Sequence, residues 1–176
     1  MNLYENKKEK VLSLNFRKEL YNAIQKFPGM HFRELQRKIS IGTGNLDYHL
    51  NYLERLNLIK IERSSNKRIY PLGLNEVERK ILGILRQKNF RKIIIKILME
   101  RDIDHKGLVN FLNISPSSVS WYVNKLVENN IIIYYENSKR KKYKLKNEDE
   151  ILKVISTYKE SFIDKLVDNF IESWEK

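Results

Sequence analysis

Two basic stretches carry the residues whose chemistry is easiest to interpret. The segment IYYENSKRKKYKL places five cations within six residues: Lys139, Arg140, Lys141, Lys142 and Lys144. The segment KIERSSNKRIY has the same form, two short β-prone pieces around a polar centre, and its cations include Arg63, Lys67 and Arg68. Cations packed this densely repel one another unless an anion neutralises them, and the phosphates of a nucleic-acid backbone are suited to that role.

The charge of the whole chain supports a polyanionic partner. The 176 residues carry a net charge of +12, and the pI is about 9.7. Residues 1–73 hold 14 Lys/Arg against 7 Asp/Glu, residues 74–146 hold 16 against 7, and residues 147–176 hold 4 against 8. A charge that served solubility alone would not be confined to two blocks and reversed in the third. We therefore expect a nucleic acid as the partner of the two basic blocks.

Catalysis has little support in the sequence. The chain has no cysteine, which excludes disulfides, thiolate metal sites and a cysteine nucleophile. The three histidines, His31, His49 and His105, are dispersed, and Gly42-Thr43-Gly44 lacks the Lys-Ser/Thr of a phosphate-binding loop. We predict no enzyme activity, no catalytic residues, no metal site and no cofactor.

No segment has the composition of a membrane anchor. No apolar run approaches the roughly 18 residues needed to span a bilayer, and the first ten residues, MNLYENKKEK, lack the apolar core of a signal peptide. We expect a cytoplasmic protein without membrane contact.

The two basic blocks are related by an internal repeat with an offset of 73. Leu35–Leu72 aligns with Leu108–Leu145 without a gap, and nine positions are identical. They include Asn51 and Asn124, Leu53 and Leu126, and Tyr70 and Tyr143. We therefore predict one domain over 1–73 and a second over 74–146, which begins with a linker helix, followed by a separate segment over 147–176.

Each copy has the pattern helix, helix, turn, helix, hairpin. In the first copy a third helix carries the apolar stripe Leu46, Leu50, Leu53 and Leu56 at helical spacing. In the second copy Asp104 is placed to cap the helix HKGLVNFL, and Ser115 followed by Pro116 is a strong start signal for the third helix. The second copy's third helix has Val119, Val123 and Leu126 on its core face.

This order and two motifs resemble a known family. The stretches LVNFLNISPSSVSWYVNKLVENNIIIYYENSKRKKYKL and LQRKISIGTGNLDYHLNYLERLNLIKIERSSNKRIYPL resemble the ArsR/MarR-type winged helix-turn-helix of bacterial and archaeal transcription regulators. The resemblance implies a mainly α fold with small β-hairpin wings, as two tandem winged helix-turn-helix domains. Tandem pairs of this kind are familiar among archaeal regulators, with the archaellum-regulator type among the candidates.

The resemblance also implies which residues contact DNA. A winged-helix third helix normally enters the major groove, and its outward residues here are Thr43, Asn45, Tyr48 and Asn51 in the first copy and Ser117, Ser118, Ser120, Trp121, Asn124 and Lys125 in the second. Asn51 and Asn124 are the leading candidates for base recognition, because an Asn amide pairs with adenine N6 and N7. Both could equally be surface residues of a helix.

Two features leave alternatives open. Asp47 repels phosphate, so it either accepts a hydrogen bond from cytosine N4 or indicates that the first copy contacts protein. Tyr48 and Trp121 occupy equivalent positions, and they either stack on unpaired bases or pack against a neighbouring element.

The linker and the tail are both expected to be helical. In the linker, NEVERKILGILRQKN has apolar residues at helical spacing, and Asn75 and Glu78 resemble a capping pair. In the tail, apolar residues recur at spacings of three or four from Glu148 to Trp174, which predicts one long amphipathic C-terminal helix. Such a stripe needs a partner, and we favour a homodimer over packing against the same chain.

The leading hypothesis is a sequence-specific transcription regulator that binds double-stranded DNA, with a second copy of the chain and the basal transcription machinery as further partners. The alternatives are a tandem winged-helix module that binds protein and a protein that binds single-stranded nucleic acid.

Overall fold

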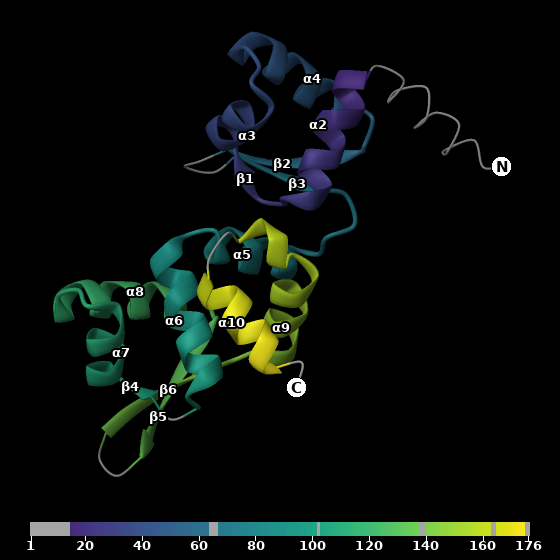
Figure 1. Ribbon diagram of the computed structural model, residues 1–176. Helices are drawn as coiled ribbons and strands as arrows, with labels where there is room; N and C mark the ends of the chain where they lie inside the picture. Colours follow the sequence, from purple (N-terminus) through teal and green to yellow (C-terminus); the bar gives the residue numbers. More distant parts are fainter. Residues whose placement is uncertain (1–14, 64–66, 102, 138–139, 163–164, 175–176) are drawn as a thin grey trace. The chain divides into compact units, whose positions relative to one another are not determined.

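The computed structural model describes residues 15–63, 67–101, 103–137, 140–162 and 165–174 (Figure 1). The chain is mainly helical with small antiparallel hairpins, which confirms the predicted composition of the fold. It divides into two compact units, unit 1 up to residue 79 and unit 2 from residue 80. The division falls within α5 (Glu76–Leu85), and each unit is described by itself.

Unit 1 consists of a three-stranded sheet and three helices that precede or cover it. In chain order these are α2 (Asn15–Lys26), β1 (Met30–His31), α3 (Phe32–Ile39), α4 (Thr43–Arg55), β2 (Ile59–Arg63) and β3 (Lys67–Pro71). The strands are antiparallel in the order β1-β3-β2, and β2 and β3 form what we call the first hairpin.

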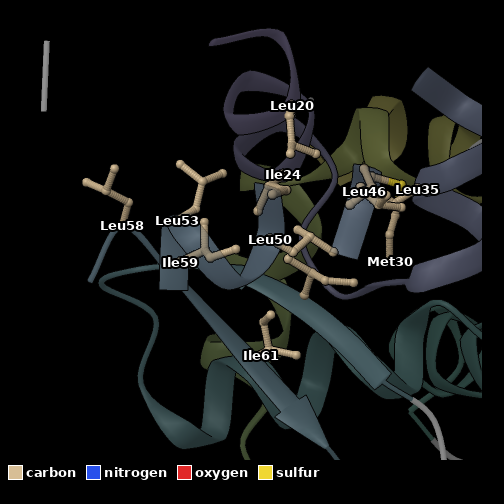
Figure 2. Close-up of a cluster of buried hydrophobic side chains, with 11 residues drawn as sticks. Leu20, Ile24, Met30, Leu35, Leu46, Leu50, Leu53, Leu58, Ile59 and Ile61 are labelled. Atoms are coloured by element: carbon tan, nitrogen blue, oxygen red, sulfur yellow. The ribbon is translucent and has the colours of Figure 1, made fainter. Parts of the chain in front are cut away.

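The core of unit 1 gathers the apolar face of α4. Leu46, Leu50 and Leu53 have no exposed surface, because their spacing of three and four places them on one side of the helix. Figure 2 shows them with side chains of α2 and the first hairpin, such as Ile24 and Ile59. This part of the predicted stripe is confirmed, whereas Leu56 is only partly buried at the edge of the core.

Unit 2 has the same order of elements. These are α6 (Lys88–Met99), β4 (Ile103–Asp104), α7 (His105–Leu112), α8 (Pro116–Glu128), β5 (Ile132–Asn137) and β6 (Arg140–Leu145). Each of its three helices begins and ends 73 residues after a helix of equal length in unit 1. The strand order β4-β6-β5 matches as well, and β5 and β6 form the second hairpin.

Local capping signals explain where these helices begin. The Asp104 side chain accepts a hydrogen bond of 2.9 Å from the Gly107 N–H at the start of α7. Ser115 accepts one from the Ser118 N–H at the start of α8, with Pro116 in its first turn. In α5 the Asn75 and Glu78 side chains each accept a hydrogen bond from the other's backbone N–H. All three predicted caps are confirmed.

The linker forms two helices rather than one. The predicted helix covers the stretch NEVERKILGILRQKN, but α5 ends at Leu85 and α6 begins at Lys88. The buried Arg91 guanidinium donates a hydrogen bond of 2.6 Å to the Leu85 carbonyl, one of the carbonyls at the end of α5 that lack a helical partner. No helix of the described residues is long and apolar enough to cross a bilayer.

The two hairpins differ by one residue, which corrects the gapless alignment. Ile59 pairs with Pro71 in the first hairpin, and Ile132 pairs with Leu145 in the second. The strands β2 and β5 are therefore offset by 73, but β3 and β6 are offset by 74. Tyr143 corresponds to Ile69 and not to Tyr70, because a one-residue difference in the turn shifts every later partner.

The C-terminal segment is not one long helix. It forms α9 (Glu148–Thr157), the short 3₁₀ turn η1 (Lys159–Ser161) and α10 (Lys165–Trp174). The α9 helix ends where the weak helix formers Ser156 and Thr157 precede Tyr158, whose backbone is not helical.

The break places the apolar residues of the tail inside unit 2. Ile155, Phe162 and Phe170 are almost completely buried, α10 lies against α6, and the Arg86 guanidinium donates a hydrogen bond of 2.7 Å to the Ser161 hydroxyl. A straight helix would leave much of this stripe in water. The observation behind the predicted homodimer is therefore accounted for within one chain, and the dimer itself stays a prediction.

Candidate nucleic-acid interface

The outward face of α8 presents an aromatic and an amide to solvent. Trp121 is 53% exposed and Asn124 is also exposed, on the side opposite the buried Val119, Val123 and Leu126. Neither Trp121 nor Asn124 forms a hydrogen bond with another described residue. Both side chains are therefore available to a partner.

The other predicted residues of α8 are engaged with their neighbours. The Ser117 and Ser118 hydroxyls lie 3.0 and 2.8 Å from the Ser115 hydroxyl, and Ser117 is exposed. The Ser120 hydroxyl lies 2.9 Å from His105 Nε2, and Lys125 forms an ion pair of 2.7 Å with Glu128. These contacts fix the outline of the face that surrounds Trp121 and Asn124.

The second hairpin presents cations on both of its faces. The alternation of side chains in a strand places Arg140, Lys142 and Lys144 on one face of β6 and Lys141 on the other. The Lys141 ammonium lies 4.9 Å from the centre of the Tyr134 ring, and Lys144 lies 6.0 Å from that of Tyr135. Among the described residues no carboxylate pairs with Lys141 or Lys144. Lys139 lies outside the described residues.

Asp104 is the acidic group at the base of this hairpin. Its carboxylate lies 3.9 Å from the Arg140 guanidinium, which is 75% exposed. The Gly107 N–H first, and then the charges of Lys142 and Arg140, lower the Asp104 pKa below its ordinary value. Asp104 is thus ionised at neutral pH and offsets part of the positive charge.

The corresponding face of α4 in unit 1 is exposed but more internally bonded. Tyr48 is 57% exposed, and Asn45 and Thr43 are exposed, with the Thr43 hydroxyl accepting a hydrogen bond from Gln36. Asn51 is half-buried, and its amide donates a hydrogen bond of 2.9 Å to Asp47. Unlike Asn124, Asn51 is held by a neighbour on its own helix.

The cations of the first hairpin are paired with carboxylates of α4. The Lys67 ammonium lies 2.5 Å from Asp47, and Arg63 contacts both oxygens of Glu54 at 2.5 and 3.0 Å. Lys67 is the main cause that lowers the Asp47 pKa, and Arg63 is the main cause for Glu54. Arg68 donates a hydrogen bond of 2.8 Å to the Gly29 carbonyl. All three predicted cations of this hairpin therefore have partners within the chain.

The sequence interpretation missed these ion pairs. Asp47 and Glu54 are seven residues apart and share the outward face of α4, while Arg63 and Lys67 lie directly opposite each other in the hairpin. Helical spacing combined with strand alternation was the signal that could have joined them. The exposed Tyr134, which lies beneath Lys141, was also missed.

His49 lies on the inner side of α4. Its ring is 4.9 Å from that of Phe16, and its Nδ1 atom is buried without a hydrogen-bond partner among the described residues. Burial is the main cause that lowers the His49 pKa, and the nearby Arg17 charge acts in the same direction. A neutral imidazole packed between rings is a structural feature, as the sequence suggested.

Comparisons with known proteins agree with this geometry. Residues 15–82 match a family model described as an N-terminal HTH domain. Over 139 residues the chain is 32% identical to a protein of Methanocaldococcus jannaschii named as an uncharacterized HTH-type transcriptional regulator. The match covers 73% of this chain, which spans 35% of the length of that protein. Both similarities support a DNA-binding regulator with a helix-turn-helix.

Proposed function

We propose that the chain is a sequence-specific transcription regulator that binds double-stranded DNA through two tandem winged helix-turn-helix domains. One observation carries the proposal: the exposed face of α8 with Trp121 and Asn124 lies on the same unit as a hairpin whose Lys141 and Lys144 have no carboxylate partner among the described residues. The α8 helix packs against β5 of that hairpin, so the two surfaces belong to one rigid unit.

The two surfaces have different roles in the proposed complex. The α8 helix enters the major groove, where the Asn124 amide pairs with adenine N6 and N7 and the Trp121 ring lies beside the base edges. The cations of the second wing contact phosphates on the adjacent backbone and displace counterions. The phosphate contacts supply most of the affinity, and the contacts to the bases supply the sequence preference.

The proposed protein has no enzyme activity and acts in the cytoplasm as a regulator of archaeal type, in contact with the basal transcription machinery. The test of the central claim is a binding titration of the full chain against duplex and single-stranded DNA of random sequence, repeated at several salt concentrations. We expect tighter binding to duplex and a steep loss of affinity with salt. A selection from a random duplex library should then yield a preferred site.

Single-stranded binding is the second candidate, because Tyr48 and Trp121 are each more than half exposed and could stack on bases. Preference for single strands in the same titration would replace the duplex proposal with this one. A chain that binds neither polymer would leave the protein-binding module as the remaining function.

We also propose a homodimer, as terminal helices of similar regulators commonly provide one. Because the tail buries Phe162, Phe170 and Ile171 inside unit 2, the dimer contact would have to use other surfaces of α9 and α10. Light scattering at micromolar concentration tests this directly, since a mass of 21.2 kDa would identify a monomer.

A further inference from the structure

Asp47 is held by two neighbours at the centre of the outward face of α4. One carboxylate oxygen lies 2.5 Å from the Lys67 ammonium, and the other accepts a hydrogen bond of 2.9 Å from the Asn51 amide. The Asp47 side chain remains 48% exposed. A side chain fixed on both oxygens and still open to solvent is prepared to accept a further hydrogen bond in one direction.

We propose that Asp47 is a base-recognition residue of unit 1: its carboxylate accepts a hydrogen bond from the N4 amino group of a cytosine in the major groove, while Asn51 pairs with a neighbouring adenine. Because unit 2 has a different residue at this position, one chain recognises two unlike half-sites. The inference rests on the proposed duplex-binding function and assigns it a specific base preference.

The charge of Asp47 does not oppose this role. A lone carboxylate would repel phosphate, but the Lys67 ammonium balances it at 2.5 Å. The same contact keeps the carboxylate ionised, so Asp47 can only accept hydrogen bonds and not donate them. Each carboxylate oxygen has about two acceptor positions, and the contacts to Lys67 and Asn51 leave capacity on both oxygens. An acceptor-only group favours the amino group of cytosine over the acceptors of guanine and thymine.

Asp47 also determines the orientation of the Asn51 amide. A carboxylate cannot donate, so the NH₂ group of Asn51 must face Asp47 and its carbonyl oxygen must face away. The remaining N–H and the carbonyl oxygen are the groups that pair with adenine N7 and N6. Residues four apart on a helix are roughly 5–6 Å apart at Cβ, which suits neighbouring base pairs.

Unit 2 lacks this arrangement. Ser120 occupies the position 73 residues after Asp47, and its hydroxyl lies 2.9 Å from His105 Nε2. Lys141, which corresponds to Lys67 in the hairpin, lies over the Tyr134 ring instead of a carboxylate. Asn124 therefore stands without an oriented acidic neighbour, and the two third helices present different donors and acceptors.

The experiment is a selection from a random duplex library with the full chain and three variants. Asp47→Ser copies the residue that α8 tolerates at the matched position, Asp47→Ala removes the side chain's polar atoms, and Ser120→Ala is the matched control in unit 2. Thermal melting confirms that each variant is folded. The parent should select two unlike half-sites, one of which contains a cytosine next to an adenine.

Both Asp47 variants should lose the preference at that cytosine, with discrimination against other base pairs falling about tenfold, the factor that corresponds to a good base contact. Ser120→Ala should keep it. The inference is overturned if the Asp47 variants select the parent's site unchanged. It is also overturned if they bind every duplex more tightly with a steeper salt dependence, because Asp47 would then only neutralise Lys67. A parent that selects no sequence would instead remove the proposed function itself, and this inference with it.

Discussion

The third helices of the two units, α4 and α8, have the same length and the same buried face but opposite electrostatic surroundings. Asp47 and Glu54 of α4 pair with two cations of the first hairpin. The matched positions in α8 hold Ser120 and Val127, neither of which carries a charge. The cations Lys141 and Lys144 of the second hairpin rest against tyrosine rings instead of carboxylates.

This difference shows that the number of cations in a segment does not measure its attraction for phosphate. A cation already paired with a carboxylate must give up that partner before it contacts DNA, and the freed carboxylate then repels the backbone. Unit 1 is therefore expected to contribute more to base selection, and unit 2 more to the salt-dependent affinity.

The largest effect is expected where the two units are alike. Leu53→Ala and Leu126→Ala each remove a side chain with no exposed surface. Each should lower the free energy of unfolding by about 2–5 kcal/mol, because the cavity left behind is closed on all sides. Urea denaturation followed by circular dichroism measures the loss, with the exposed Asn45→Ala as control. A small loss for one leucine alone would show that the two cores are not equivalent.

The next effect separates the two hairpins. Replacing Arg140, Lys141 and Lys144 with alanine should weaken binding to every duplex, and the log–log slope of affinity against salt should fall by roughly 0.9 for each phosphate that the variant no longer neutralises. The matched set Arg63, Lys67 and Arg68 should change the slope less, since those cations have partners within the chain. Fluorescence anisotropy across salt concentrations measures both. Equal slopes would erase the electrostatic distinction between the units.

A smaller effect concerns the two asparagines. Asn124→Ala should cost about 1–3 kcal/mol on the preferred site and relax the preference at one adenine. Asn51→Ala should cost less affinity, because the second hairpin holds unit 2 more firmly on the duplex. Binding to random duplex should hardly change in either variant. If both variants select the parent's sites, Ser117 and Trp121 become the next candidates for base recognition.

The smallest effect concerns the starts of the two helices. Ser115 caps α8 with its hydroxyl, and Ser115→Ala should destabilise the protein by about 1 kcal/mol. The matched residue of α4 is Gly42, which has no side chain to cap with but has an extended backbone and free space around its Cβ position. Gly42→Ser should therefore gain a few tenths of a kcal/mol. Thermal melting of both variants tests the pair, and a destabilised Gly42→Ser would contradict it.

Much of the fold follows from local sequence signals. Leu46, Leu50 and Leu53 recur at helical spacing, and such a stripe must be buried whatever it packs against. Ser115-Pro116 and the Asn75–Glu78 pair mark helix starts through contacts within four residues. These predictions succeeded because the interactions that determine them are short in sequence.

The failures involve interactions that are distant in sequence or that periodicity cannot distinguish. The spacing from Ile155 to Phe162 fits a continuous helix, yet the chain bends between them so that both become buried. The Arg63–Glu54 and Lys67–Asp47 pairs join a helix to a hairpin, and only the fold brings them together. The turns of the hairpins were misaligned because Arg140–Lys142 lacks the apolar alternation that would fix a register.

The additional residue in the second hairpin has a consequence for anyone who builds chimeras of this protein. Copying β6 onto the positions 73 residues earlier would place Tyr143 at position 70, whose native tyrosine donates a hydrogen bond to the Arg79 carbonyl from the outer side of the sheet. Every transplanted side chain would then point to the wrong side. A graft has to be joined inside the turn, with the length of the donor loop retained. By the same reasoning, inserting or deleting a single turn residue would exchange the inner and outer faces of the returning strand at once, a change that no point substitution can produce.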